Sequence, residues 1–198
     1  MYPSLRTNHK IKPTLWSDQD GVIAQYEHHA WKPSEINPNP IGFCHGAHYF
    51  LNVPPNDTII HTYEEMNHQL EFHVITNLID DEILTTEHAM DKKIWTQNHM
   101  PYLNQKDQYH IITVPKWQYA QSFLQRPLRI TDILISDYNK DLKPWIHTGG
   151  TAVKYLNGLN SQSSFQGPCI QPNWNPTQIT QFLIELIQNK QEEINHGR

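Results

Sequence analysis

The sequence predicts an α/β fold, a three-layer sandwich around a mainly parallel five-stranded sheet, and three observations lead to this class. Segments with strand character alternate along the chain with segments of helical periodicity. The strand-like segments end at polar or acidic residues, among them Asp18, Thr76 and Asp137. The length of 198 residues suits one domain with a sizeable core. Because ligands bind at the carboxyl ends of parallel strands, these residues predict one common site.

The predicted elements follow one another in alternation. The strands are short apolar segments that cover residues 13–17, 71–76, 109–114, 130–136 and 151–156. The helices cover residues 58–70, 82–99, a segment from Lys116 onward, 139–147 and 177–189. The helix at 139–147 is closed by Gly149-Gly150, as expected after a helix end. The polar stretch 157–174 predicts a surface loop.

An irregular segment interrupts this alternation after the first strand. Residues 23–57 contain five of the prolines, with the aromatic residues Phe43, Tyr49 and Phe50 between them. We therefore expect a small, mostly helical cap insertion at 23–57, and a core formed by residues 1–22 and 58–198.

Composition excludes several classes of protein. Mean hydropathy is −0.66 and no apolar stretch is long enough to span a membrane, so we expect no membrane partner. The formal charge of −5, without a run of Lys or Arg, argues against an extended nucleic-acid surface. The amino terminus does not resemble a secretory signal, which favours a cytoplasmic location. Cys44 and Cys169 are expected to be free thiols. The sequence neither indicates nor excludes a homodimer.

The turn after the first strand carries two carboxylates. Asp18 and Asp20 lie two residues apart and Gly21 permits the sharp turn that follows. One carboxylate can attack phosphorus while the other transfers protons. A D-x-D-G turn alone is equally typical of an ordinary surface turn, so its surroundings decide.

Those surroundings resemble a known family. The segment SDQDGVIAQYE is similar to the opening of the 5'(3')-deoxyribonucleotidase and small 5'-nucleotidase branch, of bacterial or phage type, of the haloacid dehalogenase superfamily. Three later segments resemble its other motifs in the same order: FHVITN, KWQYA and ILISDYNKDLKPWIHTGGTAVKYL. The resemblance covers roughly residues 15–156 and implies a Rossmann-like fold.

The resemblance implies a mechanism. Asp18 would accept the phosphoryl group and Asp20 would act as acid and base, while Mg²⁺ would be bound by Asp18, Asp20 and Asp137. The sequence departs from the family at Ser136, where an acid is usual, and at Tyr138, where arginine is usual. These departures motivate the alternative of a ligand-binding protein without turnover.

The same resemblance assigns the phosphate and substrate contacts. Thr76, Asn77 and Lys116 would bind the phosphoryl oxygens. The expected partner is a small phosphomonoester, a (deoxy)ribonucleoside monophosphate, whose base would stack on Phe43, Tyr49 and Phe50 of the cap. Packing of these rings within the cap is the competing interpretation.

Three alternatives remain beside this function. The motifs specify the chemistry and not the leaving group, so another small phosphomonoester fits equally well. End-processing of nucleic acid occurs in the superfamily but conflicts with the acidic balance of the chain. A zinc site at Cys44, His45 and His48 has no second ligand pair, so ordinary histidines are favoured there.

Overall fold

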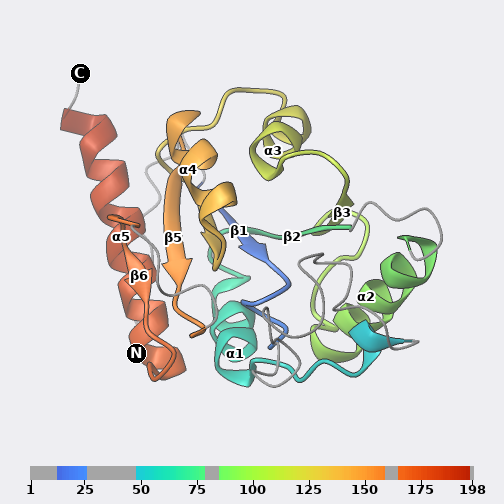
Figure 1. Ribbon diagram of the computed structural model, residues 1–198. Helices are drawn as coiled ribbons and strands as arrows, with labels where there is room; N and C mark the ends of the chain where they lie inside the picture. Colours follow the sequence, from blue (N-terminus) through green and yellow to red (C-terminus); the bar gives the residue numbers. More distant parts are fainter. Residues whose placement is uncertain (1–12, 26–47, 79–84, 159–164, 197–198) are drawn as a thin grey trace.

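A computed structural model describes residues 13–25, 48–78, 85–158 and 165–196. Within these residues the chain forms one parallel sheet with the order β3-β2-β1-β4-β5-β6 (Figure 1). Its strands are β1 (Thr14–Asp18), β2 (Glu71–Asn77), β3 (Tyr109–Ile112), β4 (Asp132–Ser136), β5 (Thr151–Tyr155) and β6 (Cys169–Ile170).

The prediction of five strands is wrong by one. The sixth strand, β6, lies within the stretch 157–174 that was expected to be a loop. It pairs in parallel with β5, Lys154 opposite Cys169 and Tyr155 opposite Ile170. Two residues are too short to show any alternation in the sequence, so only the tertiary pairing reveals this strand.

Helices cover both faces of the sheet. Their bounds are α1 (Asp57–Met66), α2 (Thr85–His99), α3 (Lys116–Leu124), α4 (Asn139–His147) and α5 (Pro176–His196), together with the short 3-10 helix η3 (Tyr49–Leu51). Helix α1 packs beside α5, and α3 packs beside α4 (Figure 1). Helix α2 contacts η3. The three-layer architecture is confirmed.

Alternating strand residues separate two apolar clusters. Leu15, Val74 and Ile135 belong to the cluster that contains residues of α1 and α5. Trp16 and Leu134, which point to the other face, belong to the cluster that contains residues of α3 and α4. Because a strand directs successive side chains to opposite faces, a central strand buried on both sides is apolar throughout.

The predicted elements agree with the observed ones apart from their ends. Helix 139–147 has the expected bounds, and Gly149 follows it with a φ of 102°, a conformation that favours glycine. The last helix extends to His196 instead of residue 189. The helix α1 begins at Asp57 because the side chain of Asn56 accepts a hydrogen bond from the backbone N–H of Ile59.

Most of the predicted cap lies outside the described residues. Residues 26–47, and with them Phe43, belong to that part. The described end of the interval contains η3 and leads into α1. The domain boundaries therefore stay a prediction.

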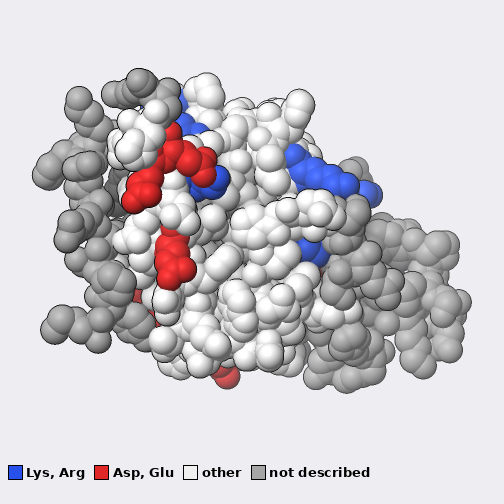
Figure 2. Space-filling view, turned by 90° about the vertical axis from the view of Figure 1, so that its left-hand side faces the viewer, with Lys and Arg blue, Asp and Glu red and all other residues white. Residues whose placement is uncertain are grey.

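The described helices include none that is long and apolar enough to cross a membrane. The face of the molecule on the α5 side is largely uncharged (Figure 2). Acidic side chains gather toward one edge of this face, and basic side chains lie in separate small groups.

The strand order defines where a site can form. From β1 the chain proceeds outward to β2 and β3, and then returns to place β4 on the other side of β1. The direction of succession reverses between β1 and β4, and open α/β sheets bind ligands outside the carboxyl ends of strands at such a point. Asp18 ends β1, and Asp137 directly follows β4.

Candidate active site

The carboxylate of Asp18 is the centre of a polar cluster at the carboxyl ends of β1 and β4. It is 5% exposed, and its Oδ2 atom accepts hydrogen bonds from the ammonium of Lys116 and from Ser136 Oγ, the latter at 2.9 Å. Lys116 is the first residue of α3 and also contacts Asp141 Oδ2 at 2.6 Å. Three segments far apart in the sequence thus meet at Asp18.

The surroundings of Asp18 strongly disfavour its charged form. Burial raises the pKa of Asp18 to about 7, Lys116 opposes this shift, and Asp141, Asp137 and Asp20 add to it. Burial alone would lower the pKa of Lys116, but Asp18 and Asp141 outweigh it, so its pKa is raised and the ammonium stays charged. The single ammonium of Lys116 is therefore shared between two carboxylates, Asp18 and Asp141.

Asp20 lies in the turn that follows β1. The carbonyl of Gln19 accepts the backbone N–H groups of Ile23 and Ala24 at 3.0 and 2.9 Å, and Gly21 has a φ of 77°. This turn reverses the chain immediately beyond Asp20 and keeps both aspartates at the same edge of the sheet.

A buried lysine from α2 holds the Asp20 carboxylate. Lys92 is 2% exposed and donates to Asp20 Oδ2, to Thr76 Oγ1 at 2.8 Å and to the Asn77 carbonyl at 3.0 Å. Thr76 Oγ1 also donates to Asp20 Oδ2 at 3.1 Å. The other carboxylate oxygen of Asp20, Oδ1, is buried and has no hydrogen-bond partner among the described residues.

Asp137 is positioned by Gly21 and Asn157. The Nδ2 atom of Asn157 donates to Asp137 Oδ2 at 2.6 Å and to the Gly21 carbonyl at 3.0 Å. A Cβ atom at position 21 would overlap the Asp137 carboxylate. Two features therefore require glycine at position 21: the positive φ and the close approach of the Asp137 carboxylate.

The residues present fit a hard divalent cation. Asp18 and Asp137 are buried carboxylates at the carboxyl ends of the neighbouring strands β1 and β4, and Mg²⁺ prefers oxygen ligands. Two features indicate a missing positive charge: the raised pKa of Asp18 and the unpaired buried Oδ1 of Asp20. A cation beside Asp18 would stabilise the ionised form of this carboxylate.

The structure brings most of the predicted residues together. Lys116 reaches Asp18 directly, and Thr76 reaches Asp20. Asn77 contributes its carbonyl to Lys92, while its side chain donates to the Val114 carbonyl at 3.1 Å.

Sequence reasoning missed three residues: Lys92, Asp141 and Asn157. Asp141 lies in the first turn of the predicted helix 139–147, directly after the acidic end of a predicted strand, and this position could have revealed it. Lys92 lies on the same helix face as the buried residues His88 and Thr96, four residues away on either side. Because all three side chains are polar, no apolar periodicity in the sequence indicated that Lys92 is buried.

The two described cap aromatics lie against α2. Phe50 is 4% exposed and packs edge-to-face on Tyr49 and on His88, with ring centroids 5.3 and 5.0 Å apart. The ammonium of Lys92 lies 4.4 Å from the centre of the Phe50 ring. In this arrangement the Phe50 ring is part of the core, and Tyr49 is half-buried. Phe43 lies outside the described residues.

Comparison with known proteins identifies structures of similar fold but no related sequence family. The sequence matches no protein-family model and no curated protein. The structure is similar to a D,D-heptose 1,7-bisphosphate phosphatase from Burkholderia thailandensis, with a TM-score of 0.56 and 10% identity, over 89% of this chain and 99% of that one. It is also similar to a HAD-superfamily hydrolase from Ehrlichia chaffeensis, with a TM-score of 0.51 and 13% identity, over 89% and 98% of the two chains.

The chain therefore shares the fold of these two proteins, an α/β fold with a parallel sheet, as its sequence predicted. At such low identity the likeness concerns the fold alone and does not extend to the nucleotidase branch.

Proposed function

We propose that this chain is a magnesium-dependent phosphomonoester hydrolase in which Asp18 accepts the phosphoryl group. The observation that carries the proposal is the pairing of the buried Asp18 carboxylate with Lys116 at the switch point of the sheet. Asp20 lies two residues further on and is itself held by a buried lysine. A nucleophile, a proton carrier and fixed cations are thus grouped at one edge of the fold.

The chemistry would proceed in two displacements. Asp18 attacks phosphorus in line, the bond from phosphorus to the ester oxygen breaks, and Asp20 gives a proton to that departing oxygen. Asp20 then takes a proton from water, which attacks the aspartyl phosphate and releases inorganic phosphate and the Asp18 carboxylate. Lys116 offsets the charge of the transferring oxygens, and Lys92 keeps Asp20 in place.

Bound Mg²⁺ would neutralise part of the phosphoryl charge. Asp18, the Asp20 main-chain carbonyl and Asp137 are the residues that would hold it. Gly21 and Asn157 would keep Asp137 in position, because they contact its carboxylate in the described structure.

The proposed substrate class is the (deoxy)ribonucleoside 5'-monophosphate, which rests on the resemblance of the sequence motifs to the nucleotidase branch. A sugar phosphate is the second candidate. One observation favours it: Phe50 is packed in the core and is not open to stack on a base. One structure of similar fold is, in addition, a heptose bisphosphate phosphatase.

Phosphate release from a panel of phosphomonoesters tests both the proposed chemistry and the proposed substrate class. We expect Mg²⁺-dependent release from nucleoside monophosphates that exceeds release from sugar phosphates. Greater release from sugar phosphates would contradict the nucleotide substrate class but would agree with the proposed chemistry. An absence of release from every member, with Mg²⁺ present, would contradict the function.

A further inference from the structure

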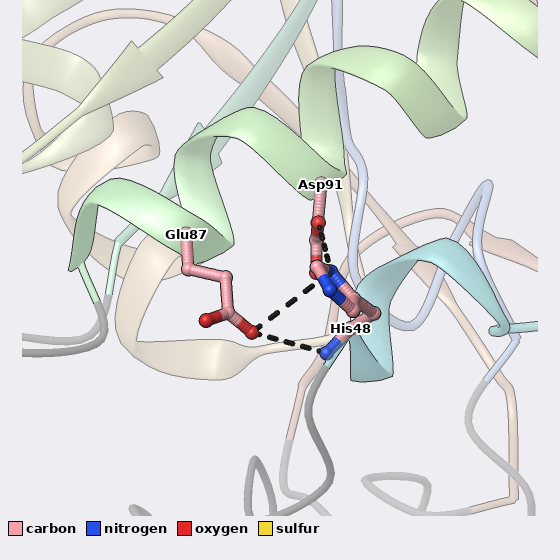
Figure 3. Close-up of side chains that lie close together, drawn as sticks. All are labelled: His48, Glu87 and Asp91. Carbon is pink, nitrogen blue, oxygen red and sulfur yellow. Dashed lines mark hydrogen bonds and ion pairs between the residues drawn. The ribbon is translucent and has the colours of Figure 1, made fainter.

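A second group of ligand-type side chains lies where η3 meets α2. His48 directly precedes η3, and Glu87 and Asp91 belong to the first turns of α2 (Figure 3). One nitrogen and two carboxylate oxygens of these residues lie within 4.8 Å of one another. His48 Nδ1 is 3.1 Å from Asp91 Oδ1 and 4.0 Å from Glu87 Oε1.

The two carboxylates need a positive charge between them. Glu87 and Asp91 are four residues apart, so they lie one above the other on the same helix face, where like charges destabilise the helix. The Asp91 side chain is 3% exposed, and a buried carboxylate requires a partner. Lys92, the next residue, directs its ammonium to Asp20 instead.

Hydrogen bonding leaves this group incomplete. Asp91 Oδ1 contacts His48 Nδ1, and the backbone N–H of His48 donates to Glu87 Oε1 at 3.1 Å. Asp91 Oδ2 is buried and has no hydrogen-bond partner within the described part of the chain. An unpaired oxygen of a buried carboxylate requires a partner such as an ordered water or a cation, and the neighbouring imidazole and second carboxylate supply further ligand atoms for a cation.

We propose that His48, Glu87 and Asp91 bind a divalent transition-metal ion, with Zn²⁺ as its representative. Tetrahedral Zn²⁺ with ordinary bond lengths needs ligand atoms about 3.4 Å apart, and the two measured separations bracket this distance. The imidazole nitrogen selects such an ion over Mg²⁺ and Ca²⁺, which prefer oxygen. On binding, His48 Nδ1 gives its lone pair to the metal and any proton to solvent.

This site is separate from the cluster around Asp18 and does not depend on the proposed function. The ion would join the segment at His48 to α2, and three protein ligands leave one position for water. Because Lys92 follows Asp91 in the same helix turn, the ion would also fix the part of α2 that holds Asp20.

Zn²⁺ binding to the full chain tests the proposal. The protein is freed of metal with a chelator and then kept in excess Mg²⁺, so that oxygen-only sites are filled before Zn²⁺ is titrated by calorimetry. We expect one Zn²⁺ per chain at this site, and a rise in Tm of about 5–10 °C at a hundredfold excess over Kd. Bound Co²⁺ should give visible absorption bands that report the nitrogen and oxygen ligands.

A matched pair of histidine variants locates the ion. We expect His48→Gln and Glu87→Gln each to lower Zn²⁺ affinity at least tenfold, and both side chains are exposed enough for the fold to persist. His61→Gln is the control, since His61 is also exposed and lies 3.7 Å from Glu64 on α1. Its Zn²⁺ affinity should equal that of the unaltered protein.

Two results would overturn the proposal. One is the absence of Zn²⁺ binding by the unaltered protein in excess Mg²⁺. The other is equal Zn²⁺ affinity in the unaltered protein and in both His48→Gln and Glu87→Gln, with circular dichroism showing that the variants are folded.

Discussion

The ammonium of Lys92 is buried against the carboxylate of Asp20, although 72 residues separate the two in the chain. The same ammonium donates to Thr76 Oγ1 at 2.8 Å and to the Asn77 carbonyl at 3.0 Å. These contacts occupy Asp20 Oδ2, whereas the buried Oδ1 has no hydrogen-bond partner among the described residues. We therefore expect Lys92 to position Asp20 for the proposed proton transfer.

Replacing Lys92 by methionine tests this role. Lys92→Met keeps the length of the side chain but leaves the Asp20 carboxylate without its cation. We expect kcat for phosphomonoester hydrolysis to fall by about a hundredfold, because a positioned acid and base contributes on the order of 10²–10⁴ to the rate. The affinity for Mg²⁺ should change little, since Asp18 and Asp137 are intact.

Lys93→Met is the matched control for this variant. Lys93 is the neighbouring lysine on α2 and is exposed, so its replacement should leave kcat unchanged. If kcat for Lys92→Met also equals that of the unaltered protein, Lys92 does not position Asp20. A pH profile of kcat adds a second readout, because a purely structural effect of Lys92→Met would lower the rate without changing the shape of the profile.

The metal-free protein should lose stability as pH rises through the range where Asp18 ionises. Burial raises the pKa of Asp18 to about 7 in the folded state, above its ordinary value of 3.8. Between these two values the folded state binds more protons than the unfolded state, so the free energy of unfolding decreases with increasing pH. The stabilising contribution is complete below the unfolded pKa and is lost as pH approaches 7.

Asp18→Asn isolates this contribution, because asparagine resembles the protonated acid at every pH. Relative to the unaltered protein in chelator, Asp18→Asn should be equally stable near pH 4 and more stable at pH 8, by up to about 4 kcal/mol. Urea unfolding at a series of pH values measures the difference. A difference that stays constant with pH would mean that Asp18 titrates normally.

Gly21 should be essential for magnesium binding. In Gly21→Ala the added Cβ meets the Asp137 carboxylate, and the φ of 77° is strained for any residue with a side chain. We expect loss of Mg²⁺ binding by calorimetry, together with a decrease in the free energy of unfolding of about 1–3 kcal/mol.

Gly149→Ala separates the two effects. Gly149 also has a positive φ, 102°, and a Cβ there would meet the Leu128 carbonyl. However, Gly149 precedes β5 and so lies at the amino ends of the strands, away from Asp18 and Asp137 at their carboxyl ends. Its replacement should destabilise the fold while Mg²⁺ affinity is retained. Equal Mg²⁺ affinities in Gly21→Ala and the unaltered protein would exclude Asp137 from the metal site.

The parts of this molecule that were predictable are those encoded by local patterns. Strands β1, β2 and β4 are mainly apolar segments that end at polar residues, and the D-x-D-G turn contains the positive φ of Gly21. These features depend on neighbours in sequence, so the order of elements and the position of Asp18 follow directly from them.

The unpredicted parts depend on distant contacts. Helix α2 is polar along most of its length, so nothing local separates the buried Lys92 from the exposed Lys93. The burial of Lys92 results from Asp20 and Thr76 on other elements. Likewise β6 exists because β5 offers a free edge, and its two residues carry no pattern of their own.

The most direct measurement of the central claim is Mg²⁺-dependent hydrolysis of an aryl phosphate by the unaltered protein and by Asp18→Asn. We predict hydrolysis that requires Mg²⁺, and a loss of at least a thousandfold in kcat for Asp18→Asn while circular dichroism shows a retained fold. Turnover by Asp18→Asn within tenfold of the unaltered protein would contradict Asp18 as the phosphoryl acceptor.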